Sequence, residues 1–118
     1  MDTTASAARQ SCQLQAGDLL ILATDGLWDN LFQDDILAIV HDRSLLCGDS
    51  RGKEQEISKE LVTQARRMSE REDYESPFCV EGARHGQFRR GGKMDDITVI
   101  VASVEYLSGA THEINKEP

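Results

Sequence analysis

The sequence is poor in aromatic residues, cysteine pairs and long apolar runs, the features that mark several large classes of protein. Only 5% of its 118 residues are aromatic, so aliphatic side chains must supply most of a hydrophobic core. The three cysteines form no Cys-x-x-Cys pair, which argues against a disulfide framework or a zinc site and favours an intracellular, reducing compartment. No apolar run approaches the roughly 20 residues of a membrane-spanning helix, and the N-terminus lacks the apolar core of a signal peptide. No membrane span is therefore expected.

Basic charge is also scarce. There are 13 lysines and arginines against 21 acidic residues, which gives a net charge of −8 and argues against a nucleic-acid partner. A length of 118 residues with 39% hydrophobic content allows one domain with an ordinary core. The acidic excess fits a protein that collects carboxylates for a metal ion, and a plainly acidic surface explains it equally well.

Two acidic motifs each adjoin an apolar, strand-like run. In LLILATDGLWDN, Asp25 comes just after such a run, and in GGKMDDITVIVASV, Asp95 and Asp96 come just before another. If the two strands are neighbours, these carboxylates meet at one edge of a sheet, where they repel one another unless a cation lies between them. Mg²⁺ and Mn²⁺ prefer such oxygen ligands. Although Asp-Gly and Asp-Asp are also common turn sequences, the combination predicts a carboxylate metal site.

The strands can be placed from composition and pattern. The apolar run Leu19–Thr24 predicts a strand covered on both faces, and a turn over residues 16–18 would pair it with the alternating segment Cys12–Gln15. Residues Ile97–Val104 are rich in β-branched side chains and predict the strongest strand. The glycines at 91 and 92 predict a sharp turn before it.

Two longer helices are expected between the motifs. One covers roughly Gln33–Asp42, with Asp29 or Asn30 as its N-cap. The other covers about Glu54–Glu72 and buries one stripe, formed by Ile57, Leu61, Ala65 and Met68. Residues 71–90 lack a strong period and predict a loop with room for one short helix. Trp28 is expected to pack in the core beneath the acidic site.

The two motifs resemble signature sequences of the metal-dependent PPM-type serine/threonine phosphatases, the protein phosphatase 2C family. The segment SPF at Ser76–Phe78, followed by GGKMDDIT, is similar to the organellar branch, which implies a mitochondrial or plastid location. The resemblance implies an α+β fold that is part of a four-layer α-β-β-α sandwich with antiparallel sheets, about half of the complete domain. Residues 12–107 would be the C-terminal part of that domain, with 1–11 a disordered or mid-domain start and 108–118 a flexible tail.

The resemblance also assigns residues. Asp25 and Asp95 match metal ligands of the family, and Gly26 and Asp96 match positions that support the metal site or its turn. In the family, a water bridging two Mg²⁺ or Mn²⁺ ions attacks the phosphorus of a phosphoserine or phosphothreonine protein. The basic residues near the second motif are candidates to contact the substrate phosphate, with a solvated loop as the competing interpretation: Arg89, Arg90 and Lys93.

The family's metal-bridging Asp-Gly-His-Gly motif has no match, since none of the three histidines follows an Asp-Gly pair. No catalytic residue is assigned in this half, and the isolated chain is expected to be inactive without the missing N-terminal half of the domain. An alternative is a catalytically incompetent truncated fragment, or a regulatory interaction module with the same fold. A third is an acidic domain that binds one ion and has no phosphatase ancestry.

Overall fold

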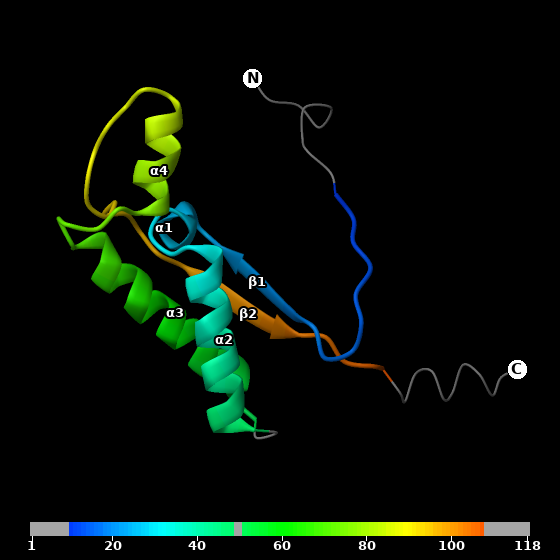
Figure 1. Ribbon diagram of the computed structural model, residues 1–118. Coiled ribbons are helices and arrows are strands. Elements are labelled where there is room, and N and C mark those ends of the chain that lie inside the picture. The colour runs from blue at the N-terminus through cyan, green and yellow to red at the C-terminus, as the bar shows by residue number, and fades with distance from the viewer. Residues whose placement is uncertain (1–9, 49–50, 108–118) are drawn as a thin grey trace, which may run out of the picture. The chain divides into compact units, whose positions relative to one another are not determined.

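The computed structural model describes residues 10–48 and 51–107, and the chain divides into two units. The larger unit spans 19–102, and the smaller combines 1–18 with 103–118. The expected tail at 108–118 and most of the expected disordered start at 1–11 lie outside the described residues. The elements, in chain order, are β1 (Leu19–Ala23), α1 (Asp25–Trp28), α2 (Gln33–Cys47), α3 (Lys53–Ser69), α4 (Pro77–Arg84) and β2 (Val99–Ser103) (Figure 1).

The two strands pair antiparallel in a two-stranded sheet (Figure 1). Both were predicted, but β1 is not covered on both faces. Its burial alternates, so that Leu20 is 37% exposed and Leu22 65% exposed, while Ile21 packs against the core. Ile100 of β2 is likewise 57% exposed. The described helices therefore cover one face of the sheet, and the expectation of a strand buried on both sides is wrong for this chain.

The predicted hairpin is also wrong. Residues 12–15 form no strand, and β1 pairs with the distant β2 instead. The turn itself is present in the smaller unit: the Asp18 N–H donates to the Gln15 carbonyl (3.0 Å), and Gly17 has a φ of 97° that favours glycine. The β-branched residues of β2 form the better partner, although they lie far along the chain.

Helix α2 starts at Gln33 as predicted but extends past Asp42 to Cys47. It ends at Gly48, whose φ of 59° suits a residue without a side chain. The N-cap is Phe32, whose N–H donates to the Asp35 carboxylate (3.0 Å). The prediction that Asp29 or Asn30 caps this helix is wrong, because both residues make contacts elsewhere.

A single turn of helix, α1, follows β1 and begins at the Asp-Gly pair, which is by itself a common turn sequence. Its Leu27 is fully buried, whereas Trp28 is 42% exposed. The indole N–H of Trp28 donates to the carbonyl of Ala23 (3.3 Å), so the ring lies over the end of the strand. The expectation that Trp28 packs in the core is therefore wrong.

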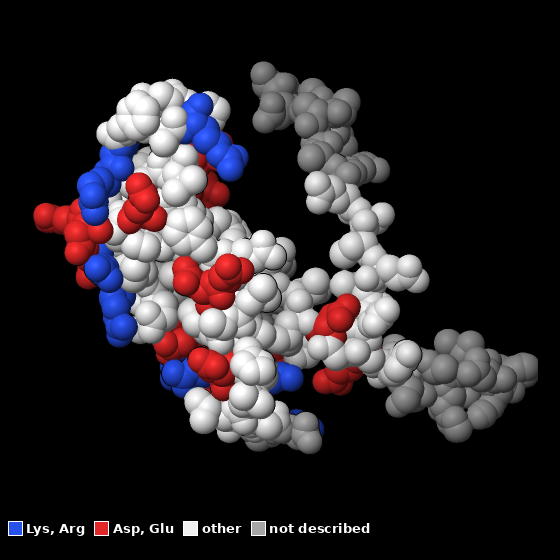
Figure 2. All heavy atoms as spheres, in the orientation of Figure 1, with Lys and Arg blue, Asp and Glu red and all other residues white. Residues whose placement is uncertain are grey.

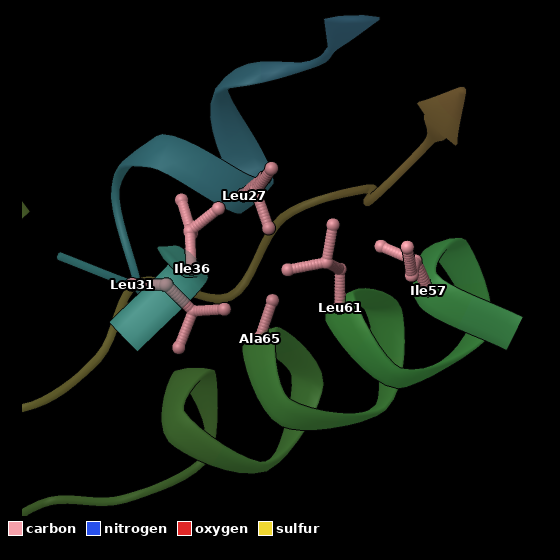
Figure 3. Close-up of a cluster of buried hydrophobic side chains, with 6 residues drawn as sticks. All are labelled: Leu27, Leu31, Ile36, Ile57, Leu61 and Ala65. Carbon is pink, nitrogen blue, oxygen red and sulfur yellow. The ribbon is translucent and has the colours of Figure 1, made fainter. Parts of the chain in front are cut away.

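The core lies between α1, α2 and α3, where six buried aliphatic side chains meet (Figure 3). The predicted stripe on α3 is confirmed: three of its residues are fully buried and Met68 partly so. Full burial of one leucine side chain stabilises a fold by about 1.5–3 kcal/mol. The six residues are Leu27, Leu31, Ile36, Ile57, Leu61 and Ala65.

The short helix expected within 71–90 is α4. Pro77 is at its start, and the Ser76 hydroxyl accepts a hydrogen bond from the Cys79 N–H (3.2 Å), a favourable N-cap. The same hydroxyl donates to the carbonyl of Gly91 (2.9 Å), which has a φ of 102°. A Cβ on Gly92 would overlap the carbonyl oxygen of Met68. Gly91 pairs with Glu75 in an isolated β-bridge and residues 91–92 form no turn, so the predicted sharp turn is wrong. The two glycines instead allow close packing of the backbone.

Candidate metal centre

Thr24 joins the two acidic motifs. Its N–H donates to the Thr98 carbonyl (3.0 Å), its hydroxyl donates to the Asp96 carbonyl (3.1 Å), and the same hydroxyl accepts from the Thr98 N–H (3.0 Å). Asp25 follows Thr24 directly, and Asp95 and Asp96 precede β2. The end of β1 and the approach to β2 therefore lie side by side, which is the condition on which the predicted carboxylate site depends.

Gly26 allows this close approach. A Cβ at this position would overlap the carbonyl oxygen of Asp96 and lie 2.8 Å from Cγ1 of Ile97. Gly26 has no positive φ, so space and not backbone conformation requires the glycine. The carboxylates on either side remain solvent-exposed: Asp25, Asp95 and Asp96.

Lys93 supplies positive charge at this edge. Its ammonium lies 3.5 Å from the Asp29 carboxylate and 3.9 Å from the Asp95 carboxylate, one in each motif. It also lies 4.9 Å from the centre of the Phe78 ring. Asp95 is oriented by a further bond, because its carboxylate accepts from the Asp96 N–H (2.8 Å). Lys93 therefore offsets part of the negative charge that the two motifs bring together.

The other basic candidates lie in different surroundings. The Arg89 guanidinium lies 5.7 Å from the Phe78 ring centre, the ring that also faces Lys93. Arg90 instead donates to the carbonyl of Asp73 (3.0 Å). On the face drawn in Figure 2, Lys and Arg side chains lie among Asp and Glu side chains, in keeping with ion pairs such as Arg71–Asp73 (3.1 Å).

Two neighbouring groups have shifted pKa values. The hydrogen bond from Arg71 lowers the pKa of the Asp73 carboxyl, with the Arg71 charge acting in the same direction. Burial raises the pKa of Tyr74, and the negative charge of Asp35 adds to this effect. The Tyr74 hydroxyl donates to the backbone carbonyl of Asn30 (3.0 Å), a bond that requires its protonated form.

Asn30 links the two motifs, a contact that the sequence did not predict. It is fully buried at the end of the first motif. Its side-chain amide donates to the carbonyls of Gly26 (2.9 Å) and Lys93 (2.8 Å) and accepts from the Lys93 N–H (2.8 Å). The sequence pattern held no signal for this role, since Asn near a helix start is ordinarily a cap.

A hollow of about 610 Å³ borders the second motif, and Glu70, Asp95 and Asp96 contribute its carboxylates. Within residues 10–48 and 51–107, however, no group of three or more His, Cys, Asp or Glu side chains is placed to hold a metal ion. Exposed carboxylate oxygens suit Mg²⁺ or Mn²⁺ chemically, but Asp25 and Asp95 are too few to complete a coordination shell. The residues that the structure describes therefore do not form a complete metal site by themselves.

Comparison with known proteins identifies the family. The sequence profile of Protein phosphatase 2C matches residues 4–73, more than half of the chain. The chain belongs to the protein phosphatase 2C family. The matched residues include the first acidic motif, and the second lies beyond them. The predicted family relationship is therefore confirmed.

Individual phosphatases are also similar to this chain in sequence. The Protein phosphatase PTC7 homolog fig of Drosophila grimshawi is 46% identical over 94 residues, 78% of this chain and 30% of that protein. The Drosophila melanogaster homolog is 38% identical over 99 residues, 78% of this chain and 29% of that protein. The chain thus spans about 30% of these relatives' length.

The fold has a counterpart among solved structures. The X-ray structure of the photosystem II phosphatase PBCP matches with a TM-score of 0.68 and 32% identity, over 81% of this chain and 39% of that one. The predicted mixture of helices with antiparallel strands is confirmed. The four-layer sandwich stays a prediction, because the described residues contain one two-stranded sheet. None of the described helices is both long and apolar enough to cross a membrane.

Proposed function

We propose that this chain supplies part of the active site of a metal-dependent phosphatase that acts on phosphoserine and phosphothreonine proteins. Asp25 and Asp95 would hold a divalent cation, Mg²⁺ or Mn²⁺, in a site that has two ions when complete. The observation that carries the proposal is the bonding of Thr24 to both Asp96 and Thr98, which brings the two motifs together within a chain of this family. Such a bound cation lowers the pKa of a water molecule and offsets charge on phosphoryl oxygens.

The remaining site residues have supporting roles in this proposal. Gly26 and Asp96 allow the two backbones to approach closely. Lys93 holds Asp95 near Asp29 and limits the repulsion between the motifs. Arg89, which shares the Phe78 ring with Lys93, is the better candidate for contact with a substrate phosphate, because Arg90 is already bonded to Asp73.

Residues 12–107 would form the C-terminal part of the catalytic domain, in agreement with a chain that spans about 30% of the length of its relatives. The bridging carboxylate and the other ligands would come from the rest of a phosphatase 2C domain, and the chain alone would turn over little substrate. Similarity to PTC7 homologs and to a photosystem II phosphatase supports an organellar location, in a mitochondrion or plastid.

A second candidate function is a regulatory or interaction module that keeps the fold without the chemistry. One observation favours it: the part of the chain that the structure describes contains no cluster of three potential ligands. The two candidate functions predict different results once the remaining part of a phosphatase domain is supplied. Only a phosphatase should then need the carboxylates of the two motifs for activity.

The test is Mn²⁺-dependent hydrolysis of a phosphothreonine peptide. It compares this chain with a chimera in which the chain replaces the matching segment of the Drosophila grimshawi relative, to which it is 46% identical. We expect activity in the chimera that is lost with Asp25→Asn or Asp95→Asn and kept with Asp42→Asn, a control on the exposed face of α2. A folded but silent chimera would favour the regulatory module, and full activity of the chain alone would refute the partial site.

A further inference from the structure

The amide of Asn30 is fully used in linking the two motifs. Both of its N–H donors and its oxygen have partners, at 2.8 to 2.9 Å, and the side chain has no exposed surface. Two of the three bonds go to the N–H and the carbonyl of one residue, Lys93. This two-point attachment fixes both the distance and the rotation of the Lys93 backbone.

The third bond ties this attachment to the other motif. The carbonyl of Gly26 accepts from Asn30, and Gly26 directly follows Asp25. Lys93 in turn precedes Asp95 by two residues. The Asn30 amide therefore links the backbone next to Asp25 with the backbone two residues before Asp95. The Thr24 hydroxyl makes a second link between the same two segments.

The backbone around Asn30 is itself held in place. Its carbonyl accepts from the Tyr74 hydroxyl (3.0 Å), and the carbonyl of the preceding Asp29 accepts from the Phe78 N–H (3.0 Å). These contacts engage backbone carbonyls, whereas the side-chain amide is held only by Gly26 and Lys93. A side chain without two donors and one acceptor cannot make the same three bonds.

We propose that Asn30 is a positioning residue that sets the register of the two acidic motifs and thereby the separation of the Asp25 and Asp95 carboxylates. This inference rests on the proposed function, in which those carboxylates bind one cation. A purely structural Asn30 would stabilise the fold and leave the cation affinity of folded protein unchanged. A positioning Asn30 sets that affinity, because residues that orient metal ligands typically change it by about 10–100-fold when they are replaced.

The chain carries its own reporter for this test. Trp28 is the one tryptophan, is 42% exposed and lies three residues after Asp25. Paramagnetic Mn²⁺ bound at Asp25 will quench its fluorescence, so the midpoint of quenching in the full chain measures affinity without any phosphatase assay. Asp25→Asn is expected to abolish the quenching and calibrates the signal.

The decisive variant is Asn30→Ala, measured in samples whose circular dichroism shows a folded chain. We expect the Mn²⁺ midpoint to rise roughly tenfold or more. Tyr74→Phe is the matched control, because it removes the bond to the Asn30 carbonyl and leaves the amide bridge intact. Its midpoint should equal that of the parent. If Asn30→Ala does not fold, Asn30→Ser, which keeps one hydroxyl donor, should show a smaller rise in the same direction.

The outcomes separate the two proposals. If Asp25→Asn abolishes quenching and folded Asn30 variants keep the parent midpoint, Asn30 has only a structural role and the inference is overturned. If Asp25→Asn leaves quenching unchanged, the cation does not bind at Asp25, which overturns the proposed site and the inference with it. A raised midpoint in both the Asn30 variant and Tyr74→Phe would show that general loosening of the segment, and not the amide bridge, sets the affinity.

Discussion

Gly26 lies against the carbonyl oxygen of Asp96, so closely that a Cβ at position 26 would overlap that oxygen. The contact joins two motifs that are far apart in the sequence. It depends on the absence of a side chain, because Gly26 adopts a φ that other residues also adopt.

Replacing Gly26 with alanine should therefore push the two motifs apart. We expect Gly26→Ala to lower the free energy of unfolding by about 1–3 kcal/mol, the usual range for a group forced into filled space. Urea unfolding measures the loss. Gly82→Ala in α4 is the control, since its Cβ would lie 3.3 Å from the nearest atom, the carbonyl oxygen of Gln87. Equal stability of the two variants would show that the Gly26 contact relaxes without cost.

The ammonium group of Lys93 places a positive charge close to the position where a cation is proposed to bind. Removing that charge with Lys93→Met should raise the affinity for Mn²⁺ by roughly tenfold at low salt, because the repulsion between a single and a double positive charge close together is on the order of 1 kcal/mol even in water. The gain should shrink in high salt. Lys59→Met, on the exposed side of α3, should leave the affinity unchanged. A loss of affinity in Lys93→Met would mean that Lys93 chiefly orients Asp95.

The exposed face of the sheet should limit solubility. Leu22 is 65% exposed, with Leu20 and Ile100 also exposed on β1 and β2. We expect Leu22→Glu to reduce concentration-dependent association of the chain, measured by analytical ultracentrifugation, with little effect on the melting temperature. Leu27→Glu, at a fully buried position, should unfold the chain. If Leu22→Glu associates as much as the parent chain, the exposed face of the sheet does not drive self-association.

Stability should fall at high pH through Tyr74. Burial raises its pKa above the ordinary value of 10.0, so the folded state favours the protonated hydroxyl that donates to Asn30. The corresponding stability is fully present below pH 10 and is lost as the pH rises through the folded-state pKa. Urea unfolding across this range should show a shallower decline in Tyr74→Phe than in the parent chain. Tyr106→Phe, at a residue 83% exposed, should follow the parent.

Strand positions were predictable from the sequence, and strand partners were not. The bounds of β1 and β2 differ from the predictions by one or two residues, because β-branched and apolar runs are local signals. The expected pairing of β1 with residues 12–15 failed, because pairing depends on contacts between segments far apart in the chain. Helix α1 was missed for a related reason: Asp-Gly is a common turn, and only the packing of Leu27 shows that the segment is helical.

The burial of Trp28 and Asn30 is the reverse of what their side chains predict. A tryptophan is usually placed inside and an asparagine outside, yet Trp28 is 42% exposed and Asn30 fully buried. Burial of Asn30 is tolerated because backbone groups of Gly26 and Lys93 satisfy its amide. Those partners come from distant segments and are visible only in the fold. The candidate ligands, by contrast, follow from the motifs alone.

The alternating burial along β1 and β2 has a thermodynamic consequence. Every second side chain of these strands gains only part of the free energy that full burial would give, since between a third and two thirds of the surface of Leu20, Leu22 and Ile100 stays in water. Any molecule that covers that face in the folded state, and does not bind the unfolded chain, will raise the unfolding free energy with the logarithm of its concentration. The melting temperature of this chain is therefore a property of the solution as well as of the sequence.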